Sequence, residues 1–153
     1  MRGVYRAPIK ISNLAAAKTL IYVTAPANKV VEILTARVGN SGTNVTNQQL
    51  EATWQKVSSL GTPTGTSITP TKMEQGDQAA GSTVVGNITA NEPTYASNTE
   101  ADKQGFASLA GYQHQPIPEE RIIVAGGDTW GLRMLSTPTA FDADVEVTLR
   151  EIG

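Results

Sequence analysis

The stretch Asp144-Val145-Glu146-Val147-Thr148-Leu149-Arg150 decides the fold class, because apolar and polar residues alternate through all of it. In an extended chain the three apolar side chains point to one face and the polar side chains point to the other. This pattern predicts a half-buried strand with one face in water, which is typical of an antiparallel sheet.

Two pairs of β-rich runs elsewhere in the chain are each joined by a turn sequence. One turn is Ala25-Pro26-Ala27-Asn28, where proline presets φ and asparagine tolerates a left-handed conformation. The other is Gly126-Gly127-Asp128, whose glycines suit the positive φ angles of a tight turn. We therefore predict two β-hairpins. They are residues 18–24 with 29–38, and residues 120–125 with 129–135.

Two segments carry helical signals. Residues 47–60 fit both helical spacing and strand alternation, and we favour a strand because both neighbouring segments are β-rich. Ser97 with Glu100 has the spacing of a capping box, which predicts a short helical turn near residues 98–103.

The whole pattern predicts an all-β domain over residues 1–153, with at most a short helical turn. About eight short strands separated by longer loops fit a two-sheet antiparallel sandwich. A jelly roll is the version we expect at this size. An immunoglobulin-like sandwich is the alternative, although its Cys…Trp…Cys signature is absent from a chain without cysteine.

Composition narrows the function classes. The formal net charge is −2, which argues against a general nucleic-acid binder. Residues 1–40 hold six basic residues and one acidic residue, and such asymmetry can orient identical subunits or dock a basic segment on an acidic partner. No apolar run reaches the length of a membrane span, and the N-terminus lacks a hydrophobic signal core. We expect a protein made in the cytoplasm, with no membrane partner.

A search for catalytic chemistry finds little to support an enzyme. His114 is the single histidine, and beside prolines we expect it to pack or to form a hydrogen bond. A cupin-type metal site needs several histidines, and a thiolate site needs cysteine. Gly126-Gly127-Asp128 lacks the context of a phosphate loop, and no Gly-x-Ser-x-Gly elbow is present. We therefore predict no catalytic, cofactor-binding or metal-binding residues.

Two stretches resemble small structural proteins of tailed phages, of the kind encoded near the major capsid protein. The first is residues 69–83, with its Gly-Asp-Gln-Ala-Ala-Gly loop. The second is residues 111–121, with its Pro-Ile-Pro-Glu-Glu-Arg segment, followed by the Gly126-Gly127 turn and residues 130–135.

This resemblance implies a jelly-roll decoration, or cement, protein on the capsid exterior. Such a protein forms homotrimers, binds the major capsid protein and clamps neighbouring capsid subunits in the virion. A receptor-binding or glycan-binding module of a head fibre or tail is the alternative function.

Two regions are the candidate contact surfaces for the capsid or for other subunits. One is an extended basic N-terminal arm at residues 1–12, with an ordinary first strand that buries Ile9 and Ile11 as the alternative. The other is the long connection at residues 61–82, because long loops in compact domains often make contacts. The candidate contact residues are Arg2, Tyr5, Arg6, Lys10, Thr62, Thr64, Lys72 and Asp77.

Overall fold

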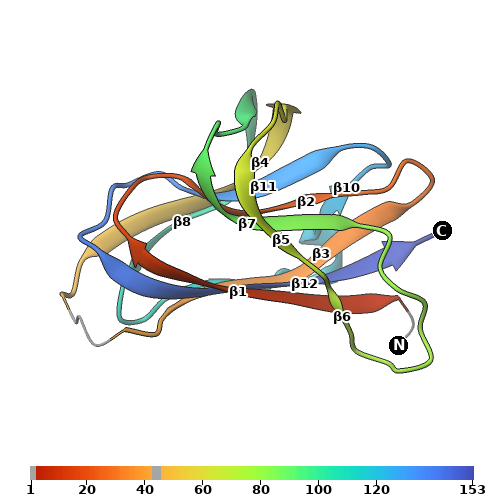
Figure 1. The fold of residues 1–153 in the computed structure, drawn as a ribbon, viewed down its shortest axis with the longest axis horizontal. Coiled ribbons are helices and arrows are strands. Elements are labelled where there is room, and N and C mark those ends of the chain that lie inside the picture. The colour runs from red at the N-terminus through yellow and green to blue at the C-terminus, as the bar shows by residue number, and fades with distance from the viewer. Residues whose placement is uncertain (1–2, 43–45) are drawn as a thin grey trace.

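The computed structural model describes residues 3–42 and 46–153, and this part of the chain folds into two packed antiparallel sheets (Figure 1). The predicted all-β sandwich is therefore confirmed. The first sheet has the order β10 (Ile122–Val124), β3 (Val30–Asn40), β12 (Phe141–Ile152), β1 (Val4–Leu14) and β6 (Thr71–Lys72), and β9 (Tyr112–His114) also pairs with β3. The second has the order β5 (Thr64–Ile68), β7 (Thr83–Ala90), β2 (Thr19–Thr24), β11 (Thr129–Met134), β4 (Gln49–Ser59) and β8 (Thr94–Ala107).

The alternating stretch quoted first forms most of β12, between β1 and β3 in the first sheet. Val145, Val147 and Leu149 are buried between the sheets, as the alternation predicts. On the opposite face, the Glu146 carboxylate lies 3.5 Å from Arg6 and 3.3 Å from Arg37, so the solvated side of the strand carries ion pairs.

Both predicted hairpins are wrong, although the turns are present. Strand β2 lies in the second sheet and β3 in the first, and β10 and β11 are divided in the same way. Each turn therefore carries the chain across from one sheet to the other. Long-range partners provide the hydrogen bonds of these strands, since β2 pairs with β7 and β11 while β3 pairs with β12. The sequence of a turn does not show that each of the two strands it joins will pair with a distant strand instead of with the other.

The two crossing turns contact each other. The Ala25 N–H donates to the Asp128 carbonyl at 3.0 Å, and the Gly127 N–H donates to the Ala25 carbonyl at 3.1 Å. A Cβ atom at Gly126 would lie 2.5 Å from the Ala27 carbonyl oxygen, so only glycine lets the two backbones approach this closely. We call these paired turns, residues 25–29 and 125–128, the double arch.

The two helical signals have different outcomes. Residues 49–59 are strand β4, as favoured, with Ala52 and Trp54 fully buried. The helical turn expected near residues 98–103 is wrong, because this segment belongs to the irregular strand β8. Asn98 and Asp102 have positive φ angles there, of 58° and 51°. Short polar side chains suit such bulges as well as they suit helix caps, which explains the false signal.

The one helical element among the described residues is the 3₁₀ turn η1 (Pro118–Glu120). No helix in this part of the chain is long and apolar enough to cross a membrane. The jelly-roll arrangement within the sandwich class stays a prediction.

Candidate functional site

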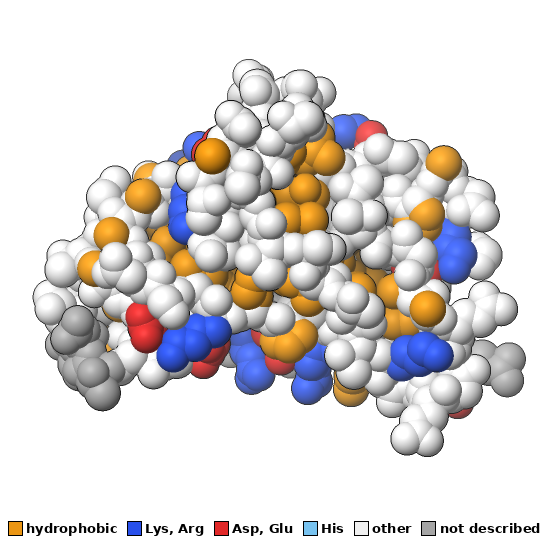
Figure 2. Space-filling model, in the orientation of Figure 1, with side chains coloured by type: hydrophobic (Ala, Val, Ile, Leu, Met, Phe, Trp, Pro, Cys, Tyr) orange, Lys and Arg blue, Asp and Glu red, His pale blue; other side chains and the backbone are white. Residues whose placement is uncertain are grey.

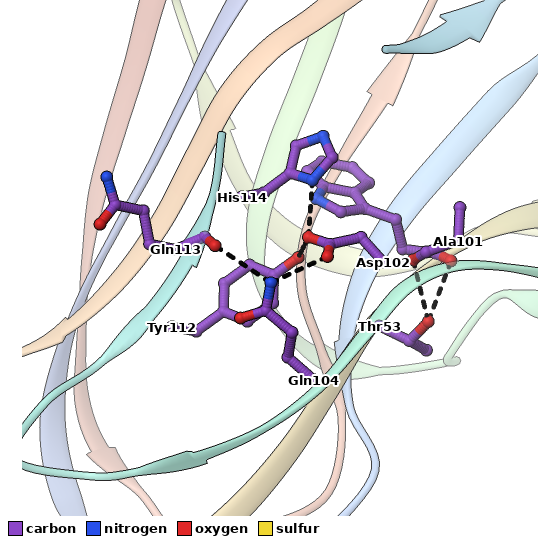
Figure 3. Close-up of polar contacts among 8 residues, drawn as sticks. Thr53, Ala101, Asp102, Gln104, Tyr112, Gln113 and His114 are labelled. Carbon is purple, nitrogen blue, oxygen red and sulfur yellow. Dashed lines mark hydrogen bonds and ion pairs between the residues drawn. The ribbon is translucent and has the colours of Figure 1, made fainter. Parts of the chain in front are cut away.

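A polar cluster joins the two sheets where their edges meet, and Asp102 is at its centre (Figure 3). A bulge in β8 positions this residue: Ala52 of β4 pairs with Gln104, while Trp54 pairs with Ala101, so β8 carries one extra residue between these pairs. Bulges of this kind redirect a side chain that would otherwise follow the strand alternation.

Strand β9 supplies the partners of Asp102 from the first sheet. Tyr112 and His114 are buried, while Gln113 between them is exposed, as expected for a strand. The Tyr112 hydroxyl donates to Asp102 Oδ2 at 2.7 Å, and His114 Nδ1 lies 2.6 Å from the same oxygen. The Gln104 amide donates to Asp102 Oδ1 at 2.8 Å, so three side chains converge on one carboxylate.

These contacts define the electrostatics of the cluster. Burial raises the pKa of Tyr112, and the hydrogen bond to Asp102 and its negative charge raise it further, so the phenol stays protonated and donates. A carboxylate oxygen accepts hydrogen bonds, so the contact with Asp102 assigns the donor role to His114 Nδ1. His114 Nε2 is then left buried without a hydrogen-bond partner, and so is Trp54 Nε1 on the neighbouring ring, whose centroid lies 6.4 Å from that of His114.

A polar cavity of about 540 Å³ opens beside this cluster. Its lining offers amide and carboxylate groups that can donate and accept hydrogen bonds with a polar ligand. Within the part of the chain that the structure describes, no protein group forms a hydrogen bond with His114 Nε2. The cavity is lined by Asp102, Gln104, Gln113, His114, Gln115, Pro116 and Glu120.

His114 fulfils the expectation of a packed and hydrogen-bonded histidine. Sequence reasoning missed Asp102, Tyr112 and Gln104, however, since the expected helical turn at residues 98–103 would have directed Asp102 differently. The one usable signal was Asp102 itself, a charged residue in a chain segment with β-rich neighbours. Within residues 3–42 and 46–153, no group of three or more histidine, aspartate or glutamate side chains is arranged to hold a metal ion.

The predicted N-terminal contact residues belong to a strand rather than to a free arm. Residues 4–11 pair with β12 along their length, as in the first-strand alternative; Ile11 is fully buried, and Ile9 is partly buried. Tyr5 is also buried, and its hydroxyl donates to the Gln78 carbonyl at 3.0 Å, so its prediction as a surface contact is wrong. An alternating strand has to direct some of its side chains inward. Arg2 lies outside the described residues.

Three of the predicted basic residues are exposed on β1 and β6, although Lys72 pairs with Tyr5 and therefore lies on the opposite face of the sheet from Arg6. Arg6 and Lys10 are exposed on β1, and Lys72 is exposed on β6, which pairs with β1. Figure 2 shows basic side chains along the lower border of the molecule in this view, where Figure 1 places β1 and β6. Acidic side chains lie among them, since Arg6 pairs with Glu146 and Lys10 lies 3.4 Å from Asp142. We call Arg6, Lys10 and Lys72 the basic edge.

The remaining predicted contacts lie on the long connection between β4 and β7. Thr62 and Thr64 are exposed, and their carbonyl oxygens accept hydrogen bonds from Asn91 and Thr89 at 3.3 Å; Thr64 is on β5 in the second sheet, whereas the basic residues are in the first. Asp77 is partly buried, and its carboxylate accepts the Gly3 N–H at 2.8 Å. The structure thus brings Asp77 to the beginning of β1 but leaves the two threonines apart.

A buried charge fixes the end of this connection. The Glu151 carboxylate accepts hydrogen bonds from the Ser82 N–H at 2.7 Å and the Ser82 hydroxyl at 2.5 Å, and the Lys29 ammonium lies 2.9 Å from it. Burial alone would raise the pKa of Glu151, but the Ser82 hydrogen bonds and Lys29 outweigh it, so the pKa is lowered and the group stays charged. The connection is therefore held against β12 where it enters β7.

Comparison with known protein families, with curated proteins and with solved structures found no match for this chain.

Proposed function

We propose that this protein is a virion structural protein that decorates a phage capsid, where it bridges neighbouring copies of the major capsid protein. The observation that carries the proposal is the way the long connection is held. Glu151, Asp77 and the hydroxyl of Tyr5 fasten residues 73–82 to the ends of β1 and β12. This fixes the segment that follows Lys72, while the pairing of β1 with β12 fixes Arg6 and Lys10, and a rigid binding surface loses little entropy when it docks.

The wrapping of the strands supports the jelly-roll part of the proposal. The first four strands alternate between the two sheets, with β1 and β3 in the first and β2 and β4 in the second. The final two strands do the same, since β11 lies beside β2 and β12 lies beside β1. A double-sheet roll winds its chain in this manner.

The charge pattern supports a protein partner with acidic surface groups. The ion pairs of Arg6 and Lys10 are solvent-exposed, and exposed ion pairs contribute little stability, so these cations can exchange one carboxylate for another at low cost. Binding only to the assembled shell would stabilise that shell by mass action. A trimer would add avidity, because the second and third contacts of one particle become intramolecular.

Cosedimentation with capsids tests the proposal. The probe is undecorated heads assembled from the major capsid protein encoded in the same genome. We expect the wild-type protein to pellet with the heads and the double variant Arg6→Glu, Lys72→Glu to stay in the supernatant. Lys103→Glu is the matched control, because Lys103 is a similarly exposed lysine on β8 of the other sheet, and it should pellet as the wild type does. Absence of binding to the heads by the wild-type protein contradicts the proposal.

A glycan-binding module is the second candidate function, and the polar cavity beside Asp102 is the observation that favours it. Glutamine amides and carboxylates are suited to hydrogen bonds with sugar hydroxyls. A glycan array with the wild-type protein and the Gln113→Ala variant tests this idea. Binding that the substitution abolishes supports it, whereas an array without any signal contradicts it.

A further inference from the structure

A lysine directly before β2 and an asparagine on the neighbouring strand β7 lie in direct contact. The Lys18 ammonium nitrogen, Nζ, lies 2.8 Å from the side-chain oxygen Oδ1 of Asn87. The two residues are 69 positions apart in sequence, so the fold brings them together. Neither residue takes part in the basic edge or in the Asp102 cluster.

The backbone positions both residues. The carbonyl of Lys18 accepts the Met134 N–H at 2.8 Å, which fixes Lys18 at the entry to β2 beside β11. Asn87 belongs to β7, directly after Gly86, which pairs with Ile21 of β2. Asn87 also has a positive φ angle of 52°, a conformation uncommon for residues other than glycine. The contact is therefore held by the sheet on both sides.

A carboxylate is held beside the residue that follows Lys18. Glu92 accepts hydrogen bonds from the Thr19 N–H at 3.0 Å and from the Thr19 hydroxyl, so its side chain is fixed beside the residue that follows Lys18. Lys18 and Glu92 line the same cavity of about 250 Å³. Burial lowers the pKa of Lys18, while the negative charge of Glu92 acts in the opposite direction. A partly desolvated lysine yields the free amine, which is the nucleophilic form, more readily than an exposed lysine does.

From this juxtaposition we infer that Lys18 and Asn87 form an intramolecular isopeptide bond, with Glu92 as the proton-transfer group. The Lys18 Nζ lone pair attacks Cγ of Asn87 and forms the new C–N bond. Glu92 takes a proton from Nζ and returns one to Nδ2 of Asn87. The Cγ–Nδ2 bond then breaks, and ammonia leaves. One amide replaces another, so no oxidant, reductant or further reactant is needed. The inference does not rest on the proposed capsid function.

The intact mass of the folded full-length protein is the primary test. We expect the measured mass to be lower than the sequence mass by one molecule of ammonia. Tryptic digestion should then release a branched peptide that joins the segments containing Lys18 and Asn87. A protein that keeps its full sequence mass after prolonged incubation in the folded state overturns the inference.

Two lysine variants identify the source of a lowered mass. Lys18→Arg keeps the positive charge but removes the nucleophile, so it should show the full sequence mass. Lys29→Arg is the matched control, because Lys29 contacts the Glu151 carboxylate rather than an amide, and it should still show the loss of ammonia. Succinimide formation at an asparagine also releases ammonia, but it does not require Lys18. A lowered mass that persists in Lys18→Arg therefore contradicts the isopeptide bond.

The role of Glu92 has its own readout. Glu92→Gln keeps the size of the side chain but removes its capacity to accept a proton. We expect the fraction of cross-linked protein, followed by mass over time after refolding, to rise many times more slowly than in the wild type. An unchanged rate of cross-linking would show that Glu92 takes no part in the mechanism. It would not contradict the bond itself, which the intact mass tests.

Discussion

Asp102 and Glu151 are carboxylates that the fold surrounds with donors from distant parts of the chain. Each accepts hydrogen bonds from two or more groups, and each connects segments that lie apart in the sequence. Hydrogen bonds to charged groups contribute more than neutral ones, and a partly buried donor without its acceptor is costly. These two residues should therefore dominate the polar contribution to stability.

Asp102→Asn tests the cluster between the sheets. Asparagine tolerates the positive φ angle of this position, so the backbone is not strained by the change. The new amide NH₂ group, however, faces donors from Gln104, Tyr112 or His114. We expect the free energy of unfolding to fall by about 2 kcal/mol, measured by urea denaturation with tryptophan fluorescence. Asp144→Asn, at an exposed position on β12, is the control and should change stability by less than about 0.5 kcal/mol.

The pH dependence of stability tests Glu151. Its pKa is lower in the folded protein than the ordinary value of 4.5, so its contribution is fully present above that value and is lost as the pH falls through the folded pKa. Glu151→Gln should therefore reduce stability at pH 7 and flatten the loss of stability below pH 4.5. Urea midpoints at a series of pH values measure this. An acid limb as steep in the variant as in the wild type contradicts the assignment.

The double arch is the feature that matters most at the scale of elements. It makes the chain cross between sheets twice at adjoining points, and its hydrogen bonds tie the two crossings together. Two turn sequences that would each support a hairpin in isolation therefore act as one unit. Their packing, rather than the preference of either turn, determines which sheet each following strand joins.

Substitutions at Gly126 and Gly127 measure two different costs in the double arch, the loss of close packing and the strain of the backbone. Gly127 has a φ angle of 82° with open space around it, so Gly127→Ala should cost only the strain of about 1 kcal/mol. At Gly126 a methyl group would meet the Ala27 carbonyl oxygen at 2.5 Å, and the two turns would have to separate. We expect Gly126→Ala to cost at least about 2 kcal/mol. Thermal unfolding of both variants measures the difference, and equal losses would contradict the close packing of the turns.

At the scale of the whole molecule, β1 and β12 close the fold because they join the beginning of the chain to its end. The register runs from Val4 opposite Arg150 to Leu14 opposite Phe141. Strand β1 also carries β6 on its other side, and thereby the long connection with the basic edge. Stability and the proposed binding surface thus depend on the same strand.

Removal of residues 1–8 should therefore unfold the protein or leave it strongly destabilised. The deletion removes the half of β1 that pairs with residues 146–150. It also removes the buried side chains of Val4, Tyr5 and Ala7 from the core. Circular dichroism and urea denaturation measure the outcome. Arg6→Ala is the control, since it removes one exposed side chain of the same segment and should leave the midpoint nearly unchanged. A truncated protein with wild-type stability contradicts the central position of β1.

The sequence by itself indicated several of the strands, β2, β3, β4, β11 and β12 among them, and the buried face of β12. Alternation is a property of neighbouring residues, so Val145, Val147 and Leu149 identify an inward face without reference to a partner. Only the tertiary structure decided which strands pair, because the hydrogen bonds of β2, β3, β10 and β11 come from distant segments that outcompete the local turns. The same reason applies to the candidate site: Asp102 contacts His114, and Lys18 contacts Asn87, only after the sheets have assembled and a bulge or a register has directed each side chain.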